Sequence, residues 1–106
     1  RYADGIGPWK RLIVGTRETS PGDQSEATRR TTTPTNFVAL AHAAGLAVHP
    51  WTFRNESQHL AADYGGDPLA EDQQFLALGV DGVFSDFTDT AVAARARFLS
   101  AAPAAR

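Results

Sequence analysis

The sequence predicts an α/β fold in which parallel strands are joined by crossover helices. Short apolar runs alternate with helical patterns along the chain, and a glycine separates each of two predicted helices from the strand that follows. The chain has 106 residues, 42% of them hydrophobic, which is enough for one small core and too few for most complete enzyme barrels. We therefore expect one domain over residues 1–106.

Local signals predict where the first helix and strand lie. Thr33 and Pro34 are suited to the N-cap and the first helical position, and Gly45 to the C-terminal cap. Apolar side chains recur between them at helical spacing, at Phe37, Leu40, Ala41 and Ala44. A strand over residues 46–53 follows directly.

The second half of the chain repeats this alternation. Asp67 and Pro68 begin a second predicted helix, which ends at Gly79. Residues 80–87 form a second short strand, and residues 89–100 the last helix. Residues 16–35 are polar and lack apolar periodicity, which predicts an exposed loop excursion over 16–33, before the first helix.

Composition excludes several classes of function. The formal net charge is −2, so neither a nucleic acid nor an anionic membrane is expected as a partner. The absence of cysteine excludes disulfides and thiolate metal sites, and it leaves the compartment open. The sequence contains no run of about 18 apolar residues, so no membrane span is predicted.

Alternation along residues 46–53 predicts two different faces. Leu46 and Val48 share one face, suited to packing under helices, while His49, Trp51 and Phe53 share the other with Ala47. Trp51 and the following Arg54 and Glu56 then lie at the carboxyl end of the strand, where ligands bind in α/β folds.

Polar residues also follow the second strand. Ser85, Asp86 and Asp89 come at its carboxyl end, so two neighbouring strands are expected to place polar groups at one rim. The planar guanidinium of Arg54 suits an anionic group such as a phosphate. Tyr2 and Trp9 are further aromatic candidates for a binding site.

These residues also have purely structural interpretations. We expect His49 to be a hydrogen-bonded interior residue, and His42 and His59 to be exposed. Trp51 can fill a barrel mouth with its N–H satisfied, and Arg54 can form a rim ion pair with Glu56. Asp86 and Asp89 suit the start of a helix, and the cap is favoured for Asp89.

Two motif interpretations are not supported. The spacing of Asp63, Asp67 and Asp72 does not follow that of a calcium-binding EF-hand loop, and Pro68 interrupts it. The "GIG" of residues 5–7 lacks the context of a dinucleotide-binding loop.

Three stretches of the sequence resemble one known family. These are "YADGIGPWK" (2–10), "AHAAGLAVHPWTFRNE" (41–56) and "LAADYGGDPLAEDQQFLALGVDGVFSDFTDTAV" (60–92). Together they are similar to the last third of the longer bacterial type of glycerophosphodiester phosphodiesterase. Thr88 departs from the resemblance, because the family commonly has proline there.

The resemblance implies a TIM-type (β/α)8 barrel that cleaves glycerophosphodiesters to an alcohol and glycerol 3-phosphate with a divalent cation such as calcium. Residues 1–106 would then be a single partial domain, the C-terminal portion of the barrel. The family's His-Arg-Gly motif, its carboxylate metal ligands and its second catalytic histidine have no match here. The resemblance thus assigns no catalytic and no metal-binding residue to this chain, and the cation would be bound outside it.

What the chain would supply is a wall for the small-molecule substrate. Trp51 would contact the glycerol or head group, Arg54 would lie near the phosphate, and Tyr2 and Trp9 would lie on a facing loop. Two alternatives remain open: a non-catalytic module that binds phosphate-containing ligands, and a structural fragment. In either form, exposed barrel edges predict that the isolated chain self-associates.

Overall fold

Helix α2 (Pro68–Ala77) forms where its local signals predict it. The computed structural model describes residues 3–101. In it the Asp67 side chain accepts a hydrogen bond from the Leu69 N–H at 3.0 Å, and Pro68 is the first helical residue. After the helix, Gly79 has φ 97°, a left-handed conformation that favours glycine. Helix α3 (Thr88–Ala101) is also confirmed, with Asp89 inside its first turn rather than at its cap.

Helix α1 (Phe37–Ala43) begins later than predicted. Thr33 and Pro34 do not start it, because the preceding segment is held against the body of the molecule. The Thr35 N–H donates to the Ile13 carbonyl at 2.8 Å, and the Thr35 hydroxyl donates to the Leu12 carbonyl at 2.7 Å. The predicted end is confirmed, since Gly45 follows α1 with φ 79°.

The strands of the α/β part are short and pair in parallel. β1 (Gly5–Ile6) pairs with β4 (Ala47–Val48), and β5 (Trp51–Phe53) pairs with β6 (Phe84–Ser85). A parallel bridge between Trp9 and Trp51 joins the two pairs. The segment from β4 to β5 therefore lies between the β1 segment and β6, which puts the carboxyl ends of β5 and β6 side by side.

The continuous strand predicted over residues 46–53 is wrong, because the structure divides it at Pro50. Proline has no N–H to donate to a ladder, and the pairing partner changes at this point. A register irregularity between Trp51 and Phe53 then breaks the predicted alternation. Phe53 is 2% exposed and joins Val48 in the core, while Trp51 remains 43% exposed.

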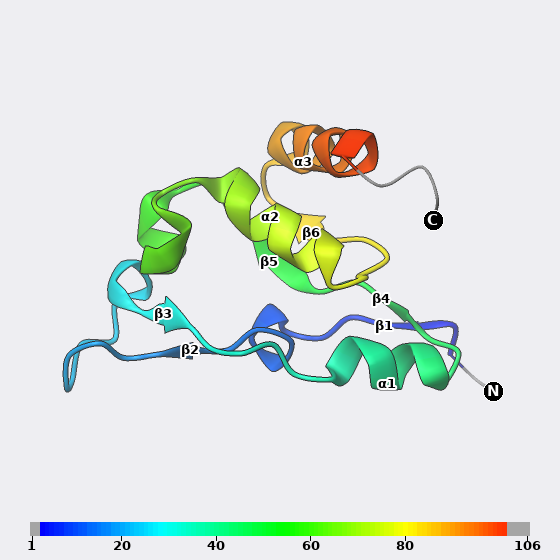
Figure 1. Ribbon diagram of the computed structural model, residues 1–106, viewed down its shortest axis with the longest axis horizontal. Helices are drawn as coiled ribbons and strands as arrows, with labels where there is room; N and C mark the ends of the chain where they lie inside the picture. Colours follow the sequence, from blue (N-terminus) through cyan, green and yellow to red (C-terminus); the bar gives the residue numbers. More distant parts are fainter. Residues whose placement is uncertain (1–2, 102–106) are drawn as a thin grey trace.

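The predicted loop excursion is exposed over most of its length but contains an antiparallel hairpin that the sequence analysis missed. β2 (Thr16–Arg17) pairs with β3 (Arg30–Thr31), and the hairpin extends away from α2 and α3 (Figure 1). The Arg29 guanidinium ties the two strands at their base, donating to the Thr16 hydroxyl at 2.8 Å and the Thr16 carbonyl at 2.9 Å.

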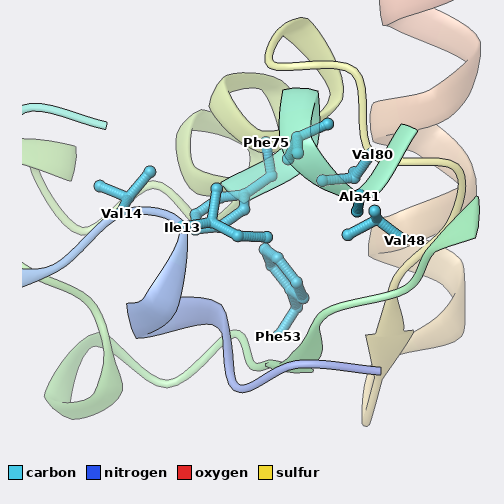
Figure 2. Packing of buried hydrophobic residues seen from close by; sticks show 8 residues of the cluster. Ile13, Val14, Ala41, Val48, Phe53, Phe75 and Val80 are labelled. Atoms are coloured by element: carbon cyan, nitrogen blue, oxygen red, sulfur yellow. The ribbon is translucent and has the colours of Figure 1, made fainter. Parts of the chain in front are cut away.

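The main core lies where α1, α2 and the parallel strands meet. Phe53 and Phe75 pack edge to face in this core, with their ring centroids 5.0 Å apart. Figure 2 shows the buried side chains of the cluster. Ile13 and Val14, just after the short helix η1 (Lys10–Leu12), close the cluster and are fully buried. This core fixes η1 against the carboxyl end of β5.

The result is a small α/β structure with parallel strands. The strands form two-stranded sheets, and no closed barrel is present within residues 3–101. In the same range, no helix is both long enough and apolar enough to cross a membrane.

Candidate functional site

The predicted rim forms at the carboxyl ends of β5 and β6. Arg54 follows β5 and makes a two-pronged contact with Glu56, with Nη2 to Oε2 at 2.7 Å and Nε to Oε1 at 3.3 Å. Arg54 Nη1 also lies 3.5 Å from Asp86 Oδ2, beyond the end of β6. The prediction that these two strands place polar groups at one rim is confirmed, as is the predicted ion pair of Arg54 with Glu56.

Two tryptophans stand beside this rim. Trp9 and Trp51 are bridge partners, each about half exposed at 49% and 43%. The indole N–H of Trp51 donates to the Gly7 carbonyl at 2.8 Å, which confirms the expectation that it is satisfied and fixes the orientation of the ring. The Trp51 face of this aromatic surface is therefore held in place by a backbone contact.

A pocket of about 160 Å³ lies between these groups, and we call it the wall pocket. Three of the four residues predicted to bind substrate line it: Trp9, Trp51 and Arg54. The fourth, Tyr2, lies outside the described residues. The remaining lining comes from Lys10, Glu26, Thr52 and His59.

Lys10 is a member of this pocket that sequence reasoning missed. It is 6% exposed, and its ammonium donates to Glu71 Oε1 at 2.9 Å and lies 5.0 Å from the centre of the Phe53 ring. Burial lowers the pKa of Lys10, and the adjacent Glu71 carboxylate opposes this effect. No local signal identifies such a pair, because Glu71 is 61 positions away in the sequence.

The histidines differ in part from expectation. His59 was expected to be exposed, but it is half-buried and lines the wall pocket. His49 was expected in the interior, yet it is exposed with its ring edge against Phe84, because the side chain leaves the core side between buried Val48 and Pro50. His42 is exposed as expected and lies 2.8 Å from Asp81 Oδ2.

The basic side chains at the rim can attract an anionic ligand, but neighbouring carboxylates compete with that ligand for Arg54. Arg54, Lys10 and His59 bring basic groups to one small pocket beside two aromatic faces. The hydrogen bond from Arg54 lowers the pKa of Glu56 to about 2, so this carboxylate is ionised across the physiological range. An incoming anion therefore has to share Arg54 with Glu56 and Asp86.

The wall pocket combines aromatic, basic and acidic side chains. Glu26 is its one carboxylate among the described residues, and it lies 3.6 Å from Arg11 Nη2. No group of three histidine, aspartate or glutamate side chains within the described part of the chain is arranged to hold a metal ion. These residues can orient a ligand and neutralise its charge.

Comparisons with known proteins identify a family for this chain. The model of the Glycerophosphoryl diester phosphodiesterase family matches residues 12–90, which include both strand ends of the rim. The chain is 44% identical over 88 residues to glycerophosphodiester phosphodiesterase GDPD6 of Arabidopsis thaliana, covering 82% of this chain and 21% of that protein. It is 47% identical over 60 residues to glycerophosphodiester phosphodiesterase GDPDL7 of the same plant, covering 54% and 8%.

The matched length is short relative to these proteins. The chain spans about a fifth of the first relative and less than a tenth of the second. The family match nevertheless covers most of the chain, from the last residue of η1 through the first turn of α3. On this basis the chain belongs to the Glycerophosphoryl diester phosphodiesterase family.

Proposed function

We propose that this chain supplies the substrate wall of a glycerophosphodiester phosphodiesterase, an enzyme that uses water to convert a glycerophosphodiester to an alcohol and glycerol 3-phosphate. The observation that carries the proposal is the convergence of Trp9, Trp51 and Arg54 on one pocket. These residues come from two segments about 40 positions apart, and the sequence alone predicted each as a binding residue.

Each side chain has a definite role in this proposal. Arg54 donates hydrogen bonds to the phosphoryl oxygens, and Lys10 adds a second positive charge at the pocket wall. Trp51 and Trp9 contact the carbon atoms on either side of the phosphate. Positioning of this kind contributes to rate by holding the diester in a reactive orientation.

The catalytic groups are proposed to lie outside these 106 residues, in a longer protein whose (β/α)8 barrel ends with this chain. The parallel segments at β1, β4–β5 and β6, with α1 and α2 between them in sequence, support such an arrangement. Calcium or another divalent cation would be bound there too, because the described residues do not form a ligand set for it.

The test is the release of glycerol 3-phosphate from glycerophosphocholine, with calcium and with EDTA. We expect calcium-dependent release from a chain extended upstream and none from the 106 residues alone. In the extended protein, Arg54→Ala should lower kcat/KM by at least about tenfold. Arg97→Ala is the matched control, since Arg97 is exposed on α3 and remote in sequence from the pocket.

Release by the 106 residues alone would contradict this division of roles. A second candidate function, a non-catalytic module for phosphate-containing ligands, uses the same pocket. It predicts metal-independent binding of glycerol 3-phosphate to the 106-residue chain that is lost in Arg54→Ala, together with no hydrolysis by the extended form.

A further inference from the structure

A second pocket, of about 410 Å³, adjoins the wall pocket, and we call it the hairpin pocket. Trp9 and Glu26 line both pockets, so these two side chains stand at their common border. The hairpin pocket is completed by Arg11 from η1 and by Thr16, Gln24 and Arg29 from the β2–β3 hairpin. Its volume falls in the range of about 300–1,000 Å³ typical of small-molecule sites.

Two buried polar atoms distinguish this pocket from an ordinary surface hollow. Among the described residues, Arg11 Nε and Glu26 Oε2 are the buried side-chain nitrogen and oxygen atoms that lack a hydrogen-bond partner in the protein. Both residues line the hairpin pocket. A buried polar group without a partner is costly, so such atoms favour a ligand that supplies the missing hydrogen bonds.

The unpartnered donor is held firmly in place. Arg11 is 8% exposed, and its terminal nitrogens are already engaged by Glu71 Oε2 and by the Val14 carbonyl, each at 3.4 Å. Glu26 Oε2 lies 3.6 Å from Arg11 Nη2. The hairpin pocket is therefore lined by a fixed guanidinium and by a carboxylate that lies within ion-pair distance of it.

These two atoms select among the chemical classes of alcohol. A hydroxyl group both accepts a hydrogen bond, as Arg11 Nε requires, and donates one, as Glu26 Oε2 requires. A quaternary ammonium does neither, and a primary ammonium can satisfy only the carboxylate. The half-exposed Trp9 ring offers an apolar face to the C–H groups of a cyclic polyol.

We propose that the hairpin pocket receives the alcohol head group of the diester and favours polyhydroxylated head groups over choline. This inference rests on the proposed function, which places the phosphate at Arg54 in the adjoining wall pocket. The hairpin then determines which alcohol is accepted, while the rim of β5 and β6 recognises the phosphate common to all these substrates.

The test compares binding of glycerophosphoinositol and glycerophosphocholine to the 106-residue chain and to its extended form. The readout is the pair of indole N–H signals in ¹H–¹⁵N NMR spectra, since Trp9 and Trp51 are the two tryptophans in the sequence. We expect glycerophosphoinositol to bind about 3- to 10-fold more tightly, the effect of one to two hydrogen bonds. The Trp9 signal should distinguish the two ligands more than the Trp51 signal does.

Variants assign the preference to the pocket. Glu26→Ala should bring the two affinities to within about twofold of each other, and Glu26→Gln should give an intermediate ratio. Glu18→Ala is the matched control, because it removes a carboxylate from the same hairpin outside the pocket. The backbone amide spectrum of each variant verifies that it is folded.

The outcomes separate this inference from the proposed function. Equal binding of both diesters, weakened alike by Arg54→Ala, would overturn the head-group assignment and leave the substrate wall intact. Equal binding weakened alike by Glu26→Ala would mean that the pocket takes the glycerol half, which also overturns it. A preference for one diester that persists unchanged in Glu26→Ala would also overturn the head-group assignment. Failure of both diesters to bind would overturn the substrate wall itself.

Discussion

At the scale of single residues, the site is governed by carboxylates that compete with a ligand for the same cations. Arg54 is bound by Glu56 at 2.7 Å and approached by Asp86 at 3.5 Å. Lys10 and Arg11 share the buried carboxylate of Glu71. Basic side chains are therefore pre-positioned by their acidic partners, at some cost in affinity for an anionic ligand.

Removing one competing carboxylate should make Arg54 a better anion ligand. We expect Glu56→Gln to tighten the binding of glycerol 3-phosphate by roughly two- to fivefold, measured by isothermal titration calorimetry. Glu18→Gln makes the same change of charge outside the pocket and serves as the control. A weaker complex in Glu56→Gln would show that Glu56 orients Arg54 rather than competing with the ligand.

Asp72 has a raised pKa and should make stability depend on pH. It is 4% exposed on α2, and burial, together with the neighbouring Glu71 carboxylate, raises its pKa to about 6. The folded state then holds this proton more tightly than the unfolded state, in which the pKa is near 3.8. The contribution of Asp72 to stability therefore falls as the pH rises from about 4 to about 6.

The substitution Asp72→Asn isolates this effect. At pH 7 we expect it to raise the free energy of unfolding by about 3 kcal/mol, since the pKa of Asp72 is raised from 3.8 to about 6 and each pKa unit corresponds to about 1.4 kcal/mol. Near pH 4 the variant and the parent should be nearly equally stable. Urea denaturation at both pH values measures the difference, and parallel pH profiles for the two proteins would count against a raised pKa.

At the scale of elements, predictability followed the range of the interactions that define each element. The start of α2 was predictable because Asp67 and Pro68 are adjacent to it, and its end because Gly79 is. The start of α1 was not, because Thr35 is held by a carbonyl 22 positions away, at Ile13. The division at Pro50 depends on partners that change from β1 to β6.

In the candidate site, too, only the residues marked by local sequence signals could be predicted. The proposed binding residues Trp51 and Arg54 stand at a strand end that periodicity locates, so they could be predicted from the sequence. Lys10 and Arg11 could not, because their burial depends on Glu71 about 60 positions away. The hairpin that completes the second pocket was missed because its polar residues carry no alternation of apolar and polar side chains.

Asp81 connects elements that are distant in sequence, and replacing it should loosen the backbone at the residues that it contacts. Its Oδ2 accepts hydrogen bonds from the Val48 N–H at 2.8 Å and from His42 Nε2 at 2.8 Å, joining β4, α1 and the turn before β6. The contact with His42, followed by that with Val48, lowers the pKa of Asp81. This stabilisation is therefore complete above the ordinary aspartate pKa and is lost as the pH falls through the lowered value.

We expect Asp81→Ala to lower the free energy of unfolding by about 1–2 kcal/mol at pH 7, the effect of two hydrogen bonds. It should also speed hydrogen exchange at the Val48 amide. The partner variant His42→Ala should cost less and leave that amide protected, because the bond from Val48 to Asp81 remains. Equal exchange at Val48 in both variants would contradict this arrangement.

At the scale of the whole molecule, a large apolar surface remains uncovered. A groove of about 510 Å³ runs between α2 and α3, and its lining includes Leu76, Val83 and Phe98. Phe84 on β6 is 55% exposed, and Leu99 on α3 is 59% exposed. Exposed apolar side chains of this kind are typical of interaction sites and of surfaces that promote association.

We expect the 106-residue chain to self-associate for this reason. Sedimentation velocity should give a mean mass that rises with concentration, and the chain should bind the hydrophobic dye ANS. A chain extended upstream should bind less of the dye. A monomer with a cooperative thermal transition at every concentration would show that these surfaces are tolerated in the isolated chain.

The closure of the hairpin has a consequence for how this protein can diverge. The chain leaves the body at Gly15 and returns at Thr32, where the Thr32 N–H donates to the Gly15 carbonyl at 2.8 Å. Because its two ends are fixed together, residues at the exposed tip of the hairpin can be inserted, deleted or exchanged without displacing the core. Descendants of one ancestor could therefore acquire new substrate ranges by changes confined to this hairpin, while the machinery shared by all of them is inherited intact.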